Sequence, residues 1–96
     1  IERATNVAFF IESNMKLELF YFPECPYCQI VLSKISQLDI KDKVELLHIY
    51  KNDQARERLL TDTGRKTVPC LYIDNQPMFE SAAIAAWLNK TFQKGK

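Results

Sequence analysis

The fold is decided by the stretch LELFYFPECPYC, residues 17–28, in which a short apolar strand runs directly into a cysteine pair. Residues 17–22 place apolar side chains on both faces, as a buried strand does. Pro23 breaks this strand, and Pro26 suits the first turn of a helix. Apolar residues then recur at spacings of three or four up to Leu38, which predicts a helix with one buried face.

Three more strands are expected further along the chain. Val44–Tyr50 is largely apolar, which is typical of a central parallel strand. Val68–Ile73 and Gln76–Phe79 are separated by Asp74-Asn75, a turn pair that suits a tight hairpin. These last two strands are therefore predicted to be antiparallel.

Two more helices are expected between and after these strands. Asn52 or Asp53 can cap the first, and Gly64 ends it. Ser81 caps the second, whose buried stripe continues to Phe92. The order is β-α-β-α-β-β-α, and a right-handed helical crossover makes the first two strands parallel. The predicted fold class is α/β, with a four-stranded mixed sheet and helices on both faces.

The bulk composition indicates one ordinary globular domain and excludes several kinds of partner. The chain has 96 residues, of which 47% are hydrophobic and 26% charged. A formal net charge of +1 gives no footprint for nucleic acid. The longest strongly apolar run is too short to cross a bilayer, so we expect no membrane span.

The first residues are predicted to be an extension. Met15 stands just before the first strand, so we expect the domain over residues 15–96 and an N-terminal extension over residues 1–14. The extension is either a short amphipathic helix or a frayed terminus, because it has apolar residues at helical spacing, namely Ala4, Val7, Ala8 and Ile11.

Cysteine and histidine usage favours a reducing compartment, and we expect the cytoplasm. Three cysteines, two of them close together, do not form the framework of a secreted disulfide scaffold. His48 is the single histidine, so four ligands at zinc spacing are lacking and no metal is expected. We expect His48 to be structural and Cys70 to be a small core residue.

Cys25-Pro26-Tyr27-Cys28 has the spacing of a redox-active pair. Disulfide exchange needs an attacking thiolate and a second thiol that can resolve the intermediate. Cys25 falls at a helix N-cap, where free N–H groups and the positive end of the dipole favour a thiolate. Cys28 lies one turn into the helix, near enough to close a disulfide and more buried. We predict that Cys25 attacks and Cys28 resolves; the alternatives are half a zinc site or two core cysteines.

The cysteine pair after a strand, with Thr67-Val68-Pro69 before another, resembles a dithiol glutaredoxin of thioredoxin-like fold over residues 16–92. The resemblance implies that Pro69 is cis and faces the cysteines. It also implies that the backbone of Val68 binds the cysteinyl part of glutathione. Tyr27, exposed between the cysteines, and Thr67 belong to the implied glutathione site.

Glu80-Ser81 departs from the usual glutaredoxin pattern and resembles the N-terminal domain of glutathione transferases. There the pair holds the γ-glutamyl end of glutathione. Free N–H groups at a helix start suit its carboxylate, and Glu80 can pair its ammonium; the alternative is an ordinary helix cap. A second departure lies upstream, where Phe22 replaces the Lys or Arg of many glutaredoxins. Glu24 opposes thiolate formation.

The predicted function is glutathione-dependent reduction of protein–glutathione mixed disulfides and protein disulfides by a monomer. Glutathione is the co-substrate, and the partners are glutathionylated or disulfide-bonded proteins. Arg65 or Lys66 is expected to bind the glycine carboxylate of glutathione, or else both are simply exposed loop residues. One alternative is a glutathione-transferase-like N-terminal domain. Another is a binding module for a glutathione-ligated [2Fe–2S] cluster.

Overall fold

The computed structural model describes residues 15–92, so the predicted extension over residues 1–14 lies outside the described part. The elements follow the predicted order, with a 3-10 turn added before the second strand. They are β1 (Leu17–Tyr21), α2 (Pro26–Leu38), η1 (Lys41–Lys43), β2 (Val44–His48), α3 (Asp53–Thr63), β3 (Cys70–Ile73), β4 (Gln76–Phe79) and α4 (Ser81–Phe92).

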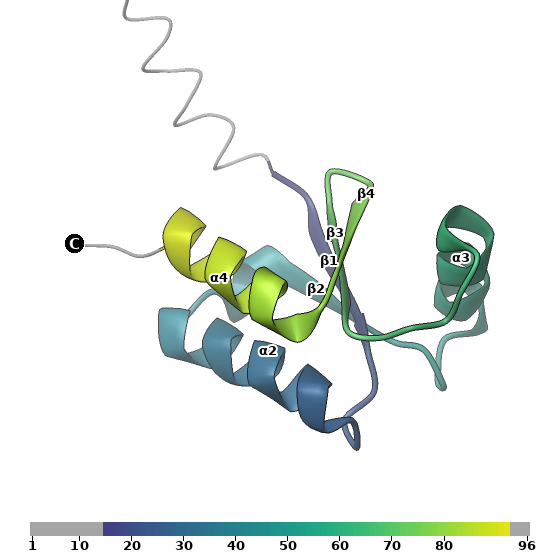
Figure 1. Ribbon diagram of the computed structural model, residues 1–96, viewed down its shortest axis with the longest axis horizontal. Coiled ribbons are helices and arrows are strands. Elements are labelled where there is room, and N and C mark those ends of the chain that lie inside the picture. Colours follow the sequence, from purple (N-terminus) through teal and green to yellow (C-terminus); the bar gives the residue numbers. More distant parts are fainter. Residues whose placement is uncertain (1–14, 93–96) are drawn as a thin grey trace, which may run out of the picture.

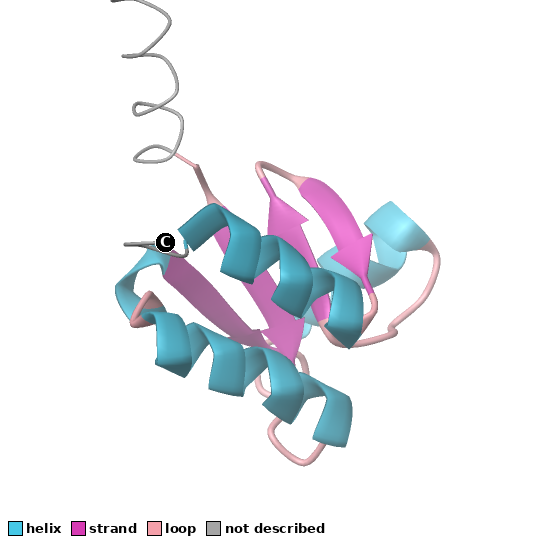
Figure 2. Cartoon of the chain, turned by 60° about the vertical axis from the view of Figure 1, so that its left-hand side comes forward, coloured by secondary structure: helices cyan, strands magenta, loops and turns pink. Residues whose placement is uncertain are grey.

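The four strands of residues 15–92 form a mixed sheet in the order β2-β1-β3-β4 (Figure 2). β1 runs parallel to β2 and antiparallel to β3, and β4 returns antiparallel to β3. The register pairs Tyr21 with His48, Phe20 with Cys70, and Cys70 with Phe79. One end of the sheet therefore carries, side by side, the strand ends that lead into the predicted site.

β2 differs from its expected position, because it lies at the edge of the sheet rather than at its centre. It also ends at His48, two residues before the predicted end. Val44 reaches the core, whereas Leu46 in the middle of the strand is 40% exposed. The apolar residues of this edge strand pack on both faces of the sheet, Val44 on the side of α2 and α4 and Leu47 on the side of α3.

Helices cover both faces of the sheet, as predicted (Figure 1). α2 and α4 pack against each other on one face, and α3 lies on the opposite face. β1 serves both sides, because successive strand residues point in opposite directions. Leu17 and Leu19 face α2 and α4, while Glu18 and Phe20 face α3. Among the helices of residues 15–92, none has the length and apolar character needed to cross a membrane.

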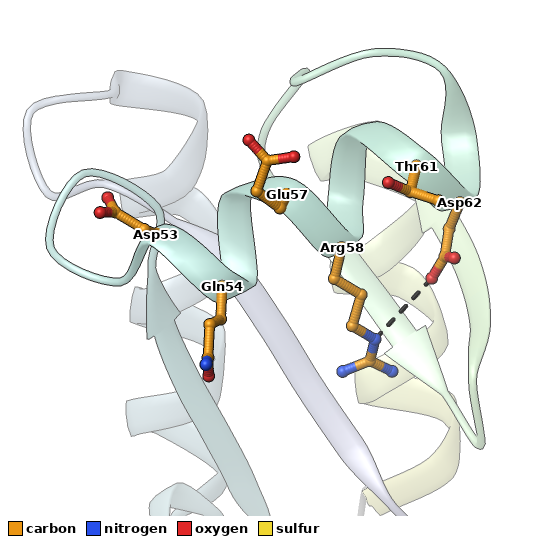
Figure 3. A pocket seen from close by; sticks show the side chains of 6 residues that line it. All are labelled: Asp53, Gln54, Glu57, Arg58, Thr61 and Asp62. Carbon is orange, nitrogen blue, oxygen red and sulfur yellow. Dashed lines mark ion pairs between the residues drawn. The ribbon is translucent and has the colours of Figure 1, made fainter.

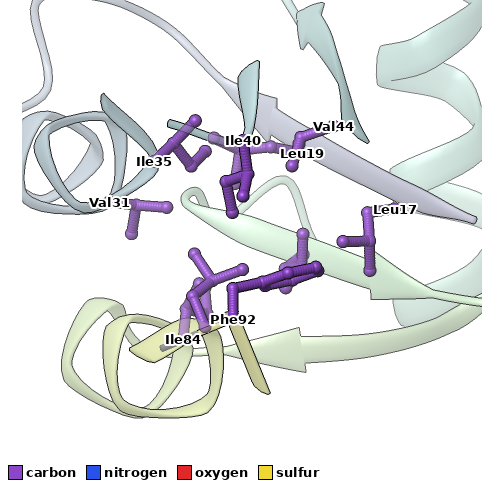
Figure 4. Close-up of a cluster of buried hydrophobic side chains, with 10 residues drawn as sticks. Leu17, Leu19, Val31, Ile35, Ile40, Val44, Ile84 and Phe92 are labelled. Carbon is purple, nitrogen blue, oxygen red and sulfur yellow. The ribbon is translucent and has the colours of Figure 1, made fainter. Parts of the chain in front are cut away.

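Two hydrophobic cores hold these layers together. The larger core lies between the sheet and the α2–α4 pair (Figure 4), and its buried members are Leu17, Leu19, Val31, Ile35, Ile40, Val44, Leu71, Ile84, Leu88 and Phe92. The smaller core lies under α3 and comprises Phe20, Ile49, Ala55, Leu59, Cys70 and Tyr72. Both cores draw on segments distant in sequence, so each stabilises the sheet as a unit.

Local caps and turns confirm the residues that the sequence singled out. Of the two candidate caps for α3, Asn52 is the one that caps the helix, because its side chain accepts a hydrogen bond from the Ala55 N–H at 3.0 Å, while Asp53 is the first helical residue. Gly64 ends α3 in the left-handed region, with φ of 80°. Asp74 and Asn75 have φ of 50° and 73°, as a two-residue hairpin turn between β3 and β4 requires.

A buried charge fixes α3 against the sheet. Glu18 on β1 is 4% exposed, and Arg58 of α3 donates two hydrogen bonds to its carboxylate, at 2.8 and 3.0 Å. The same guanidinium donates to the Asn75 side chain at 2.9 Å and lies 4.6 Å from the Tyr72 ring centroid. The hydrogen bonds and charge of Arg58 lower the pKa of Glu18 from 4.5, although burial acts in the opposite direction.

We predict that Arg58→Ala lowers the free energy of unfolding by about 2–3 kcal/mol, because the Glu18 carboxylate is left buried without its cation. The loss stays below that of a fully buried pair, since the Arg58 side chain is 32% exposed. Urea unfolding at pH 7 measures it. Lys16→Ala is the matched control, because its ammonium lies 3.8 Å from the same carboxylate but is 59% exposed. That change should stay under about 0.5 kcal/mol.

The difference in free energy of unfolding between wild type and Arg58→Ala depends on pH. The pKa of Glu18 is lower in the folded than in the unfolded state, so its ion pair stabilises the fold fully above about pH 4.5. This stabilisation is lost as the pH falls through the folded-state pKa, and the gap between wild type and Arg58→Ala narrows. A gap of equal size in acid would show that packing of Arg58 on Tyr72, and not charge, carries the effect.

Candidate functional site

Cys25 stands at the junction of β1 and α2, in the N-cap position of the helix. Its N–H donates to the Phe22 carbonyl at 3.2 Å, and its carbonyl accepts from the Gln29 N–H at 3.1 Å. Pro26 occupies the first turn of the helix, where its missing N–H costs no hydrogen bond. The Cys25 side chain makes no capping hydrogen bond. Cys25 therefore lies at the positive end of the α2 dipole without a direct N–H contact to its sulfur.

Cys28 lies one turn further along α2 and is fully buried, whereas Cys25 is 8% exposed. Burial raises the pKa of Cys28 to about 12; a hydrogen bond to the Cys25 sulfur acts in the same direction, and one with the Phe22 backbone opposes both. Both sulfurs are free thiols. Cys28 thus holds its proton at neutral pH and Cys25 is the more accessible of the two, which is the asymmetry expected of a resolving and an attacking thiol.

A cavity of about 300 Å³ lies where α2, the loop before β3 and the start of α4 meet. The structure brings together in its lining all the residues predicted to bind glutathione, namely Tyr27, Thr67, Val68, Pro69, Glu80 and Ser81. Arg65, Phe79 and Ala82 complete this lining. The peptide bond before Pro69 is cis, as the resemblance implied. Tyr27 joins the two parts of the site, because it stands between the cysteines and also lines the cavity.

Glu80, and not Ser81, occupies the N-cap of α4, so the predicted cap was wrong by one residue. The Glu80 carbonyl accepts the hydrogen bond of the Ile84 N–H at 3.0 Å, and Ser81 is the first helical residue. Glu80 has φ of 79°, a conformation uncommon for a residue with a side chain. This backbone turns the chain from β4 into α4 within one residue and brings the helix start, with its free N–H groups, to the cavity.

The cavity carries groups of both signs. The Glu80 carboxylate is exposed at one side. The Arg65 guanidinium lies 4.2 Å from the Phe79 ring centroid, a cation–π contact that holds it against the cavity wall. Of the two basic residues considered for a ligand carboxylate, Arg65 lines the cavity and Lys66 does not. This arrangement suits a ligand that has both ammonium and carboxylate groups.

Cys70 and His48 take the structural positions expected of them. Cys70 is buried in the core under α3, and this burial raises its pKa to about 12. The His48 Nδ1 accepts a hydrogen bond from the Tyr50 N–H at 3.2 Å, and its ring lies 5.5 Å from that of Tyr21. Neither residue lines the cavity beside the cysteine pair.

A second hollow, of about 430 Å³, lies on the outer side of α3 and was not expected from the sequence. Figure 3 shows its lining, which comes from one helix and comprises Asp53, Gln54, Glu57, Arg58, Thr61 and Asp62. Arg58 and Asp62 pair with each other across a 3.7 Å distance. Within residues 15–92, no three cysteine, histidine, aspartate or glutamate side chains converge on a point where they could hold a metal ion.

Comparison with known protein families agrees with the geometry. The sequence profile described as glutathione S-transferase, N-terminal domain, matches residues 19–95. The chain belongs to this family. The match covers the cysteine pair and every residue that lines the cavity, so the whole candidate site lies within the glutathione S-transferase N-terminal domain. Among curated proteins, none matches the chain in sequence.

Solved structures similar to this transferase-type domain share its thioredoxin-like fold. The thioredoxin-like protein BC3987, as its T8A mutant, is 26% identical with a TM-score of 0.65, over 79% of this chain and 92% of that protein. A trimeric glutathione transferase of Leishmania, TDR1, is 23% identical with a TM-score of 0.67, over 81% of this chain and 17% of its own. A Drosophila mojavensis glutathione transferase homologue with bound glutathione is 22% identical with a TM-score of 0.65, over 83% and 36%. The chain therefore spans about a third or less of these two transferases.

We predict that iodoacetamide at about pH 7.5 modifies Cys25 alone in the folded domain. Cys28 and Cys70 are fully buried, and both hold their protons because burial raises each pKa to about 12. The mass of the intact protein should therefore rise by one adduct. Cys25→Ser should gain none while folded, and the wild type unfolded in urea should gain three. Rapid modification of Cys70 in the folded domain would contradict its place in the core.

Proposed function

We propose that this domain is a glutathione-dependent thiol–disulfide oxidoreductase of the glutaredoxin type. The observation that carries the proposal is the pair of free thiols at the start of α2, of which Cys25 at the N-cap is the more accessible and Cys28 is fully buried. The adjoining cavity, with groups of both signs, supports glutathione as the co-substrate. The proposed substrates are protein–glutathione mixed disulfides and protein disulfides. We further propose that the protein acts as a monomer in the cytoplasm.

Reduction of a mixed disulfide needs one protein thiol. The Cys25 thiolate attacks the glutathione sulfur of the mixed disulfide. The bond between the two sulfurs of the substrate breaks, and the cysteine thiolate of the substrate protein leaves. A second glutathione thiolate then attacks the glutathione sulfur held on Cys25. This step releases oxidised glutathione and regenerates the Cys25 thiolate, so two electrons pass from glutathione to the substrate. The dipole of α2 and the Cys28 S–H both stabilise the negative charge on the leaving Cys25 sulfur.

Reduction of a protein disulfide uses both cysteines. Cys25 forms a mixed disulfide with one substrate sulfur, and the other leaves as a thiolate. Cys28 then attacks the Cys25 sulfur, which releases the reduced substrate and leaves a Cys25–Cys28 disulfide for glutathione to reduce. Once Cys25 is bonded to substrate it carries no charge, so the part of the pKa rise of Cys28 that comes from Cys25 disappears. Cys28 is thus easier to deprotonate in the intermediate in which it must react.

The cavity is proposed to orient glutathione with its sulfur toward Cys25. Its cysteinyl part would pair with the backbone of Val68, beside Pro69, as an added strand does at a sheet edge. The γ-glutamyl carboxylate would meet the free N–H groups at Ser81, and its ammonium the Glu80 carboxylate. Tyr27 and Thr67 would close the sides of the cavity around the bound tripeptide.

The family match favours a second candidate, glutathione conjugation to an electrophile, as in transferases. The same cavity would hold glutathione, and the glutathione thiolate would be the nucleophile. Conjugation needs neither protein thiol, whereas reduction of a mixed disulfide needs Cys25 and reduction of a protein disulfide needs both cysteines. The cysteine variants below therefore separate the two candidates.

We predict that Cys25→Ser abolishes reduction of a glutathionylated peptide and of an intramolecular disulfide, because a serine hydroxyl is almost wholly un-ionised at neutral pH. Cys28→Ser should keep reduction of the glutathionylated peptide and lose most reduction of the intramolecular disulfide. Both rates are measured with glutathione as the reductant. Full activity of Cys25→Ser would contradict the nucleophile assignment, and conjugating activity in that variant would favour the transferase candidate.

Cys70→Ser is the matched control for these substitutions. It makes the same change of sulfur to oxygen in a buried cysteine outside the pair. Both activities should be retained, with a modest loss of stability because the hydroxyl is buried. Loss of both activities in a folded Cys70→Ser protein would show that the third cysteine takes part in the chemistry.

We predict that Glu80→Gln raises the KM for glutathione about tenfold, because a charge-assisted hydrogen bond worth about 1.5–3 kcal/mol is lost. Glutamine keeps the length of the side chain at this left-handed position. Initial rates against glutathione concentration, with a glutathionylated peptide as substrate, measure the effect. Glu57→Gln is the control, since Glu57 is an exposed carboxylate on α3 that does not line the cavity. Equal KM values in the two variants would contradict the role of Glu80.

A further inference from the structure

Tyr50 and Tyr27 are the two most exposed of the large apolar and aromatic residues within 15–92, at 64% and 63%, and of these two only Tyr27 lines the cavity. Tyr50 lies in the loop between β2 and α3. Its ring packs edge-on against Phe22, with the ring centroids 5.1 Å apart and an interplanar angle of 65°. A single exposed aromatic residue is unremarkable by itself. Tyr50 differs from other exposed aromatic residues because its contact partner, Phe22, lies just before the cysteine pair.

Phe22 connects Tyr50 to both cysteines. The Phe22 carbonyl accepts the hydrogen bond of the Cys25 N–H at 3.2 Å. The Phe22 backbone also acts on Cys28, because it lowers the pKa of that thiol against the effect of burial. The exposed ring of Tyr50 therefore rests on the residue whose main chain holds Cys25 in place. Its loop is held as well, because the Tyr50 N–H donates to the His48 ring at 3.2 Å.

The sheet order places Tyr50 and the cavity on opposite sides of Cys25. Tyr50 follows the edge strand β2, and Cys25 follows the neighbouring strand β1. The cavity is built beyond β1, from the segments that enter β3 and leave β4. The strand ends concerned lie side by side in register. Cys25 is therefore flanked by the cavity on one side and by the Tyr50 ring on the other.

A mixed disulfide between glutathione and a protein has two parts, the glutathione tripeptide and the polypeptide that carries the modified cysteine, and the cavity can hold only one of them. On the proposed function, on which this inference rests, glutathione fills the cavity. We infer that the polypeptide part of the substrate lies across Tyr50 and that the domain prefers glutathionylated cysteines flanked by apolar residues. The exposed ring provides a flat apolar surface, and burying it under an aliphatic side chain is favourable. Substrate class is thus set on the β2 side of the nucleophile.

The test compares two glutathionylated peptides that differ in the residues beside the modified cysteine, Leu-Cys-Leu in one and Ser-Cys-Ser in the other. For the wild type, kcat/KM should be about three- to tenfold higher with the leucine peptide. Tyr50→Ser should bring the ratio of the two values close to one. Tyr50→Phe should keep the ratio, because the ring and not the hydroxyl makes the contact.

Leu46→Ser is the matched control. It removes an exposed apolar side chain from the middle of β2, away from the strand end that leads to Tyr50, and should keep the wild-type ratio. Equal kcat/KM values for the two peptides in the wild type, or an unchanged ratio in Tyr50→Ser, would overturn this inference and leave the proposed function standing. A wild type that reduces neither peptide would overturn the proposed function, and this inference with it.

Discussion

The site depends on the hydrogen bonding of β1 on both edges, to β2 and to β3. A strand held in this way cannot shift its register without breaking two ladders, so its carboxyl end is fixed relative to both neighbours. Phe22 lies directly after that end, and its carbonyl holds the Cys25 N–H. The position of the cysteine pair relative to the cavity is therefore set by main-chain hydrogen bonds, and the side chains around it determine only its chemistry.

Much of this arrangement could be predicted from the sequence, because it follows from local rules. The Asn52 cap, the Gly64 helix end and the Asp74-Asn75 turn each need only residues a few positions apart, and all three were confirmed. The order of the elements then follows from hydrophobic spacing. Six of the residues that line the cavity were predicted from resemblance to a family, whereas Phe79 and Ala82 were not, and the structure brings these six together. Their part in binding remains a prediction.

The features that the sequence did not predict depend on contacts between distant residues or on backbone geometry. Glu18 and Arg58 are 40 positions apart, and no local pattern pairs them. The edge position of β2 depends on which strand β3 joins, which composition does not decide. The shift of the α4 cap from Ser81 to Glu80 depends on a positive φ that glutamate seldom adopts.

The pairing of Glu18 with Arg58 also constrains how the sequence of this domain can change. Losing the arginine first would leave a buried carboxylate without its cation, while losing the glutamate first would leave Arg58 without its closest anion, held only by Asn75, Asp62 and the Tyr72 ring. Either intermediate is worse than both ends of a double exchange to well-packed apolar residues, which can be as stable as the ion pair itself. The two positions are thus expected to covary in evolution, because either single substitution lowers the stability of the domain and the exchange of both restores it.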